Sequence, residues 1–297
     1  MPEPSSILLT ICAALVVGGA LGLSGAVLQG VLRNPLADPY LLGMVGGGTL
    51  FMVLALDFGL AAWGSLVLPA ASLAGAAFAL GLVALIAWRT ARARERDGTD
   101  PQARASHASV ILAGWAVGGT LGSFDMLALA YATPENRDAV NCWLWGSLAT
   151  VRPVTLVVGA LVLALTFATL FAYRRELDVM ELGHDEAACL GVNVRKVAAV
   201  ALAVAALATS VSVALAGMVG FAGLVVPHVV RRLFGARMSR VLPLSAVFGG
   251  LFVLAAEFLG RALPGEGVGV GVVCAITGGP LFLALLASRR NGEGADI

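Results

Sequence analysis

The side chains that could do chemistry in this 297-residue sequence are few and widely separated. Its three histidines, His107, His184 and His228, belong to no H-E-x-x-H pattern, and no G-x-S-x-G pattern occurs. The cysteines are also dispersed, without a C-x-x-C pair, so we expect them to be small packing residues: Cys12, Cys142, Cys189 and Cys274. A membrane-embedded enzyme is the least favoured class, and we expect neither catalytic residues nor a metal site.

Two carboxylates in apolar stretches, Asp125 and Glu257, are candidates for a different chemistry. Secondary transporters place functional ionisable groups inside their helices. The sequence has no series of such groups that could relay protons. A secondary transporter or a channel not coupled to ATP is therefore the alternative hypothesis.

ATP binding has its own sequence pattern. No G-x-x-x-x-G-K-[ST] motif, whose backbone would cradle phosphates, is present, and the single lysine, Lys196, follows Arg195 instead of glycine. Any ATP hydrolysis must therefore come from another subunit.

The amino-acid composition indicates whether water or lipid surrounds this chain. Hydrophobic residues make up 59% of it and charged residues 12%, with a mean hydropathy of +0.92. Soluble proteins have about 25% charged residues, so lipid must cover most of this surface. A net charge of +1 leaves no broad basic face, which makes nucleic-acid binding unexpected.

Charge-free stretches predict the transmembrane helices. Residues 7–32 contain no Asp, Glu, Lys or Arg, and as a helix they would extend about 39 Å, enough to cross a bilayer core of about 30 Å. The other predicted spans are 40–56, 63–88, 107–131, 153–173, 197–217, 221–233, 241–261 and 268–288. The predicted fold class is an all-α, polytopic membrane protein with about nine transmembrane helices, in one domain over 1–297.

The seventh of these spans is short. Residues 197–230 carry no formal charge, and they are too many for one crossing and few for two. Gly217, Gly220, Gly223 and Pro227 predict a broken helix near 217–230, with a short returning helix. Membranes tolerate such a break only where protein or a water-filled path satisfies the backbone.

Basic residues near the helix ends predict the orientation. One set of loops holds sixteen of the 19 Lys and Arg residues, and the opposite set holds Arg137, Arg152 and Arg261. By the positive-inside rule the first set faces the cytoplasm, so the N-terminus lies outside and the C-terminus inside. The first segment lacks a positive n-region and exceeds the usual apolar core of a signal peptide, so we interpret it as a membrane helix.

A turn motif closes the first span, as a helix running into a cytoplasmic turn. The string Gln29-Gly-Val-Leu-Arg33-Asn34-Pro35-Leu-Ala-Asp38-Pro39 is followed by Leu42-Gly43. The prolines fix φ and push the residues before them towards extended backbone, and on physics alone this is a connector with a snorkelling arginine. The string closely resembles the Q-x-x-x-R-N-P-L-A-x-P-x-x-L-G signature of FecCD-type permeases, the membrane subunits of ATP-binding-cassette (ABC) importers for iron chelates, haem and cobalamin.

A second motif covers residues 181–193. Its acidic start and Gly191 predict a short amphipathic helix, which without the resemblance would be a solvated cytoplasmic segment. The resemblance implies a coupling helix of the EAA type that docks in a groove of the ATPase subunit. The implied interface residues are Leu182, Gly183, Glu186, Ala187, Ala188 and Gly191.

The third motif resembles the family's G-x-I-G-F-x-G-L-x-x-P-H-x-x-R. By resemblance this broken helix lies beside the translocation path, with Gly217, Gly220, Phe221, Gly223, Pro227 and His228. We expect His228 to be a hydrogen-bonded core residue and not a ligand.

An arginine on the outer side completes the set of candidate residues. Glu257 and Arg261 are four residues apart, which predicts an i,i+4 ion pair. By resemblance, Arg261 receives a glutamate of the extracytoplasmic substrate-binding protein, and such charge pairing steers docking.

The sequence also departs from the family pattern. The family usually has ten helices, and this chain would begin at the second of them, without the outer loop that carries another arginine. We expect either that the start is truncated by one helix or that the binding protein docks on Arg261 and other contacts alone. Near the last helix, Gly267-Val-Gly-Val-Gly271 replaces a usual E-L-P-x-G.

The resemblance also implies the assembly. The chain would be a permease domain in the bacterial cytoplasmic (inner) membrane, paired with a second copy of itself or with a related permease. Two ATPase subunits would bind ATP and Mg inside, so that no cofactor belongs to this chain, and a binding protein outside would deliver cargo. No residue distinguishes an iron-siderophore chelate from haem or cobalamin.

Overall fold

The computed structural model describes residues 4–64, 66–96, 107–149, 151–263 and 268–290. Arg104, between the predicted spans 63–88 and 107–131, and Gly267 lie outside the described residues. The described residues form helices and no strands. The elements are α1 (Pro4–Val31), η1 (Pro39–Leu42), α2 (Met44–Asp57), η2 (Leu60–Trp63), α3 (Val67–Arg96), α4 (His107–Tyr131), α5 (Pro134–Leu144), α6 (Pro153–Ala172), α7 (Arg174–Leu182), α8 (His184–Cys189), α9 (Val194–Ala216), α10 (Ala222–Phe234), α11 (Met238–Ala262) and α12 (Val270–Arg290).

The all-α, multi-pass character predicted from the sequence is confirmed. Within the described parts of the chain, six helices are long and apolar enough to cross a membrane: Ser6–Val31, Val67–Thr90, Leu112–Tyr131, Pro153–Ala172, Val194–Ala216 and Met238–Ala262. Two shorter apolar helices, Met44–Asp57 and Val270–Ala284, accompany them. A helix overlaps every stretch predicted as a span, because these stretches are predominantly apolar and the clusters of charged residues lie mostly between them.

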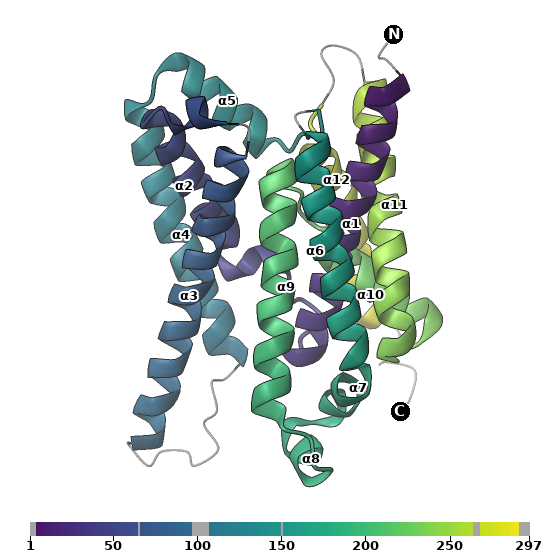
Figure 1. The fold of residues 1–297 in the computed structure, drawn as a ribbon. Helices are drawn as coiled ribbons and strands as arrows, with labels where there is room; N and C mark the ends of the chain where they lie inside the picture. Colours follow the sequence, from purple (N-terminus) through teal and green to yellow (C-terminus); the bar gives the residue numbers. More distant parts are fainter. Residues whose placement is uncertain (1–3, 65, 97–106, 150, 264–267, 291–297) are drawn as a thin grey trace.

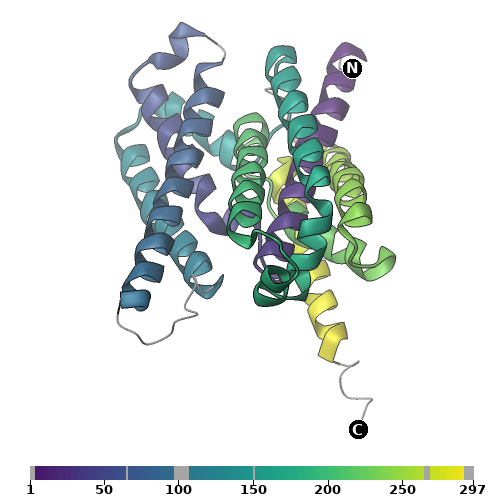
Figure 2. The same cartoon turned by 60° about the horizontal axis from the view of Figure 1, so that its bottom comes forward.

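Helix α1 is the centre of the larger group of helices. It contacts α6, α9, α10 and α11 (Figure 1; Figure 2), and its inner positions, such as Leu21 and Val27, are fully buried. Three glycines make these contacts close: a Cβ at Gly18 or Gly22 would overlap the α11 backbone, and a Cβ at Gly25 would overlap the carbonyl of Gly223. Small residues at helix crossings let backbones approach, which is how membrane helices associate.

Helices α2, α3 and α4 form a second group, with α5 across one end of them (Figure 1). Gly47 of α2 and Gly75 of α3 meet backbone to backbone, so that neither could carry a Cβ. Helix α9 contacts α3 on one side and α1 on the other, and so joins the two groups.

Several elements differ from the sequence-based expectations. Helix α5 was not predicted, and helix α7 occupies residues between the predicted span 153–173 and the second motif, where no helix was expected. The expected helix within 181–193 is shorter, because Gly183, at φ 151°, separates α7 from α8. The prediction that the cysteines are packing residues is wrong for Cys142 and Cys189, which are exposed.

Candidate coupling and translocation site

The Gln29 side chain of α1 is hydrogen-bonded to the start of α10. Its Nε2 donates hydrogen bonds to the carbonyl oxygens of Leu224 at 3.0 Å and Gly223 at 3.4 Å, and the side chain is buried. Carbonyls early in a helix already accept hydrogen bonds from within the helix, so these two do not require Gln29 as a partner. The contact shows that Gln29 lies where α1 and α10 cross. Gln29, the first residue of the turn motif, lies in the last turns of α1, in agreement with the predicted helix over 7–32.

The rest of the turn motif forms the connection from α1 to α2. Asn34 Oδ1 accepts a hydrogen bond from the Leu36 N–H at 2.9 Å, and Asp38 Oδ1 accepts one from the Tyr40 N–H at 2.7 Å. Asp38 is extended, as expected of a residue before proline, and caps η1. Pro35 belongs to the turn and Pro39 begins η1.

The connection also reaches other elements. Arg33 is exposed, at φ 46°, and its Nη2 lies 3.5 Å from the Leu182 carbonyl oxygen at the end of α7. The Tyr40 hydroxyl accepts a hydrogen bond from the Val219 N–H at 3.0 Å, between α9 and α10. The turn motif is therefore packed against both other motifs, which their separation in sequence did not reveal.

The chain between α9 and α10 has unusual backbone geometry. Gly217 ends α9 at φ 70°, where a Cβ would overlap the Trp143 carbonyl. Phe221 precedes α10 at φ 66°, a left-handed conformation that is rare outside glycine. Its ring lies against Gly278 of α12, where a Cβ would overlap it. Gly220 belongs to the same link.

The remaining residues of the third motif belong to α10. Gly223 and Pro227 are buried, Pro227 lies inside the helix, and His228 is half-buried. Pro39 of η1 lies against Gly223, close enough that a Cβ there would displace it. The third motif and the turn motif therefore form one packed unit.

The second motif consists of two short helices with one buried and one exposed face. Leu177 and Met180 of α7 and Ala187 of α8 are buried, and His184 Nε2 lies 3.2 Å from the Val31 carbonyl oxygen of α1. Gly183 is buried beside the Glu186 carboxylate. Four of the predicted interface residues are exposed: Leu182, Glu186, Ala188 and Gly191.

Two carboxylates of α7 accept hydrogen bonds from α10 and α11. Glu181 Oε1 accepts a hydrogen bond from Arg231 Nη1 of α10 at 2.5 Å, and Arg231 Nη2 donates to the Ala26 carbonyl oxygen of α1 at 3.0 Å. Asp178 Oδ1 accepts from the Met238 N–H, the first of α11, at 2.6 Å. Burial raises the pKa of the Glu181 carboxyl, and Arg231 opposes this shift. Arg231 is the arginine that ends the third motif, and Glu181 begins the second, but sequence reasoning gave no role to either of them or to Asp178.

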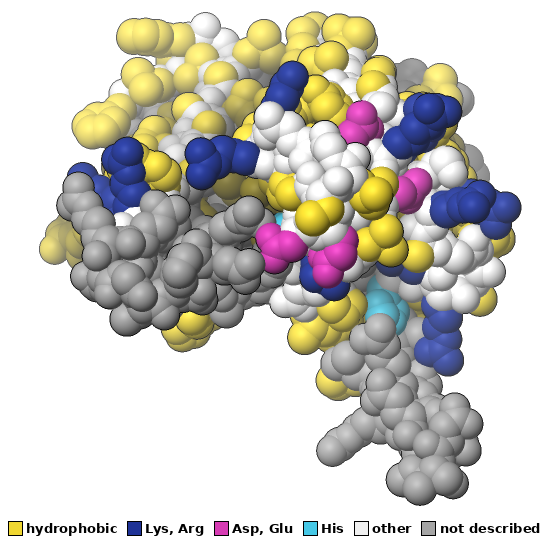
Figure 3. Space-filling model, turned by 90° about the horizontal axis from the view of Figure 1, so that it is seen from below, with side chains coloured by type: hydrophobic (Ala, Val, Ile, Leu, Met, Phe, Trp, Pro, Cys, Tyr) yellow, Lys and Arg dark blue, Asp and Glu magenta, His cyan; other side chains and the backbone are white. Residues whose placement is uncertain are grey.

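The end of the molecule that carries α7 and α8 has mixed charge. Figure 3 shows acidic side chains on its central, protruding part, with Lys and Arg side chains around them. Asp185 and Glu186 lie in the first turn of α8, where negative charge is favoured by the helix dipole. This protruding part combines exposed charge with exposed Leu182 and Leu190.

Arg261 lies at the opposite end of the bundle from α8 and is held on two sides. Its Nε donates to Glu257 Oε1 at 2.8 Å and its Nη2 to Thr10 Oγ1 of α1 at 3.0 Å. The predicted i,i+4 ion pair is confirmed. The guanidinium is still partly exposed, with 38% of the side chain accessible.

Comparisons with known proteins agree on one family. The family model described as "FecCD transport family" matches residues 5–288. The chain is 36% identical to the cobalamin import system permease protein of Halobacterium salinarum, over 92% of this chain and 70% of that protein. It is also 36% identical to the Fe(3+) dicitrate transport system permease protein of Escherichia coli K12, over 93% of this chain and 82% of that protein.

A solved structure supports the same conclusion for the fold. A metal-chelate type ABC transporter in an inward-facing conformation superimposes with a TM-score of 0.83 and 28% sequence identity. The match covers 95% of this chain and 85% of that chain.

Proposed function

The chain belongs to the FecCD transport family of ABC importer permeases, and we propose that it moves a metal chelate from outside the cell into the cytoplasm. The cargo class is an iron-siderophore type chelate, with haem or cobalamin as the other members of the class. The dicitrate and cobalamin names of the relatives and the metal-chelate name of the structural neighbour support this class. Since the family is one of transporters, the chain itself acts as a permease and not as an enzyme.

The proposed membrane arrangement combines the helices with the loop charges. Residues 1–297 form one permease domain with about nine membrane segments, in which α9 and α10 are the two parts of a broken helix. The N-terminus is outside and the C-terminus inside the cytoplasmic membrane. Epitope tags inserted after residues 95 and 235 test this arrangement, since both should be detected in the cytoplasm.

The proposed assembly contains two copies of the chain, two ATPase subunits inside and one binding protein outside. Its cargo path runs between the two permease copies, along the segment from Gly217 to His228. ATP and Mg belong to the ATPase subunits. The polar contacts of α7 support this proposal most directly, because they connect the end of the molecule that would meet an ATPase to α10 and α11, and Arg231 of α10 in turn binds α1.

These contacts suggest how motion passes through the chain. A shift of α7 is transmitted to α10 through Arg231 and to α11 through Asp178. The shift reaches α1 through Arg231 and, from α8, through His184. Helix α10 starts at the strained Phe221, and α1 is bound to that start through Gln29. A packed unit of this kind responds to partners by switching between discrete arrangements.

The alternative, a transporter not coupled to ATP, has less support. Of the two carboxylates that could serve it, Glu257 is already paired with Arg261. The deciding experiment is native purification of the chain in mild detergent, followed by mass spectrometry of associated proteins and small molecules. Recovery of an ATPase subunit and a binding protein supports the importer; recovery of the chain alone, repeated under crosslinking, contradicts it.

A further inference from the structure

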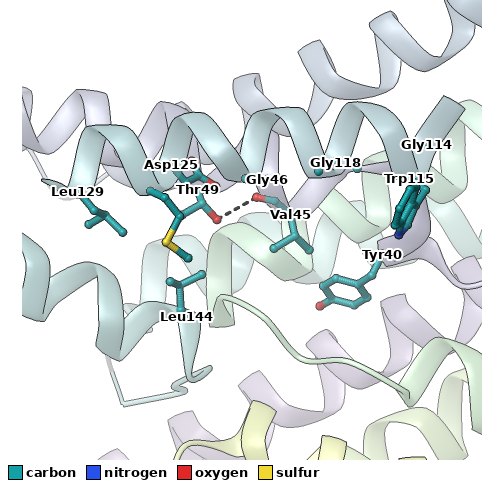
Figure 4. Close-up of a pocket in the computed structure, with 14 residues that line it drawn as sticks. Tyr40, Val45, Gly46, Thr49, Gly114, Trp115, Gly118, Asp125, Leu129 and Leu144 are labelled. Carbon is teal, nitrogen blue, oxygen red and sulfur yellow. Dashed lines mark hydrogen bonds between the residues drawn. The ribbon is translucent and has the colours of Figure 1, made fainter.

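A cavity of about 360 Å³ lies between α2 and α4, within the smaller group of helices (Figure 4). Tyr40, Thr49, Trp115 and Asp125 line it together with a set of glycines. The volume lies in the range of small-ligand sites, about 300–1,000 Å³. Of the three motifs that led to the proposed function, only the turn motif reaches this cavity, through Tyr40 and Gly43.

Helix packing explains only some of the glycines. A Cβ at Gly43 or Gly46 would press on the α4 backbone around Gly118, so these contacts need glycine. A Cβ at Gly119 or Gly122 would meet nothing within 4 Å. At these two positions a side chain would enter open space, so glycine there enlarges the cavity without serving a helix contact.

Asp125 is the ionisable group of the cavity. The residue is only 8% exposed, and its buried Oδ1 has no hydrogen-bond partner within the described residues. Thr49, on the facing helix, donates its hydroxyl to the Val45 carbonyl oxygen at 2.9 Å (Figure 4). A buried polar atom without a partner is costly, so a hydrogen-bond donor that reached this carboxylate would be favoured there.

The position of the cavity relates it to the proposed cargo path. Asp125 precedes the end of α4, Tyr131, by six residues, which is about 9 Å along a helix axis, and this is the end proposed to face outside. Tyr40, which also lines the cavity, accepts the hydrogen bond from the Val219 N–H in the link between α9 and α10. Asp125 therefore lies in the outer half of α4, and the cavity extends from it toward Gly114 and Trp115 in the other half and adjoins the proposed path.

We propose that this cavity is a cargo subsite in which Asp125 binds a protonated amine, or a similar cationic N–H group, of the metal chelate. The inference rests on the proposed function and narrows its substrate class. A carboxylate in an apolar cavity pairs with an N–H cation through charge-assisted hydrogen bonds and repels a second carboxylate. The site accordingly favours amine-bearing chelates over chelates with free carboxylates.

Three chelates that differ in one group test the preference. A linear ferric trihydroxamate with one terminal primary amine is compared with its N-acetyl and N-succinyl derivatives, which are neutral and anionic at that end. Uptake is measured in proteoliposomes that contain the complete transporter with its binding protein. Because each comparison is between the wild type and Asp125→Asn with the same chelate, the selectivity of the binding protein cancels.

We expect Asp125→Asn to reduce uptake of the amine chelate about tenfold or more, as for a lost hydrogen bond to a charged group, and to leave the acetyl chelate nearly unchanged. Uptake of the succinyl chelate should rise. Asp138→Asn, an exposed change on α5, is the control and should alter none of the three. Equal effects on the three chelates overturn the subsite; ATP-independent uptake overturns the proposed function instead.

A second measurement examines the cavity without transport. In Gly122→Cys, the reaction of residue 122 with a cationic and an anionic methanethiosulfonate reagent is followed by mass spectrometry. The cationic reagent should react faster by roughly tenfold, given one nearby charge in an apolar surrounding, and Asp125→Asn should remove the preference. If the ratio of the cationic to the anionic reaction rate is the same with Asp125 and with Asp125→Asn, the inference is overturned, even if uptake is normal.

Discussion

Arg231 Nη1 lies 2.5 Å from Glu181 Oε1, and this pair joins the last turn of α10 to the last turn of α7. Both side chains are about one-fifth exposed, so solvent screens the pair only in part. The same guanidinium also holds the Ala26 carbonyl of α1. One arginine thus connects the proposed coupling element to two helices that contact each other at Gly25 and Gly223.

Arg231→Gln should impair coupling more than folding. Loss of one partner of this pair is expected to cost about 1–3 kcal/mol of stability, and ATP-driven uptake should fall further than the amount of folded protein. Uptake and thermal unfolding of the purified complex measure the two effects. Arg175→Gln, an exposed change on α7, is the matched control.

A charge exchange makes this prediction more specific. The double variant Glu181→Arg with Arg231→Glu should recover part of the uptake that either single change loses, because the pair is restored in reverse. Additive losses in the double variant would show that the two side chains act independently.

The pKa of Glu181 predicts a pH dependence of stability. Burial raises this pKa, so the folded chain binds the proton more readily than the unfolded chain does. The pKa of glutamate in the unfolded chain is about 4.3. The resulting stabilisation is fully present below that pH and is lost as pH rises through the higher folded pKa.

Thermal unfolding in detergent between about pH 4 and 7 measures this effect as a difference between two proteins. The melting temperature of the wild type should fall with rising pH relative to that of Glu181→Gln, which has no proton to lose at this position. Parallel pH profiles for the two proteins would refute the assignment.

Gly191→Arg should abolish ATP-driven uptake while membrane insertion persists. Gly191 is exposed at φ 83°, beside α8, and a Cβ there would meet nothing within 4 Å. The large side chain would therefore obstruct a partner, and the positive φ would also strain the backbone at this position. Gly191→Asn separates obstruction of the partner from strain of the backbone. Asparagine is smaller than arginine and tolerates this backbone conformation, so this variant should retain uptake. Normal transport by Gly191→Arg would remove α8 from the proposed interface.

Arg261→Glu should weaken docking of the binding protein, and the loss should be largest at low ionic strength. The change replaces a guanidinium held by Glu257 and Thr10 with a second carboxylate beside Glu257. Surface-binding measurements at low and high salt compare it with Arg152→Glu, which alters another exposed arginine on the proposed outer side. Equal losses for the two variants would indicate a general charge effect and contradict a specific role of Arg261.

Much of the helix pattern could be predicted from the sequence, because apolar runs and the charges that bound them are local properties. The predicted range 107–131 coincides with α4. Helix α5 was missed because it is too polar for a span, although Thr133, Pro134 and Glu135 form a recognisable helix start.

The contacts within the site could not be predicted in the same way. The bonds of Tyr40 to Val219 and of Arg231 to Glu181 join residues far apart in the chain, so no local spacing indicates them. The motifs identified the segments, but their side-chain partners depend on how the helices pack. Asp125 was noticed as a carboxylate in an apolar stretch, whereas its cavity became visible only between two folded helices.

The most direct test of the central claim is uptake of a radioactive ferric chelate by proteoliposomes that contain the natively purified complex, with ATP inside or outside as the orientation requires. We predict uptake that needs both hydrolysable ATP and the binding protein and that is absent in Gly191→Arg. Uptake that continues without ATP hydrolysis, or that follows an imposed proton gradient instead, would contradict the account.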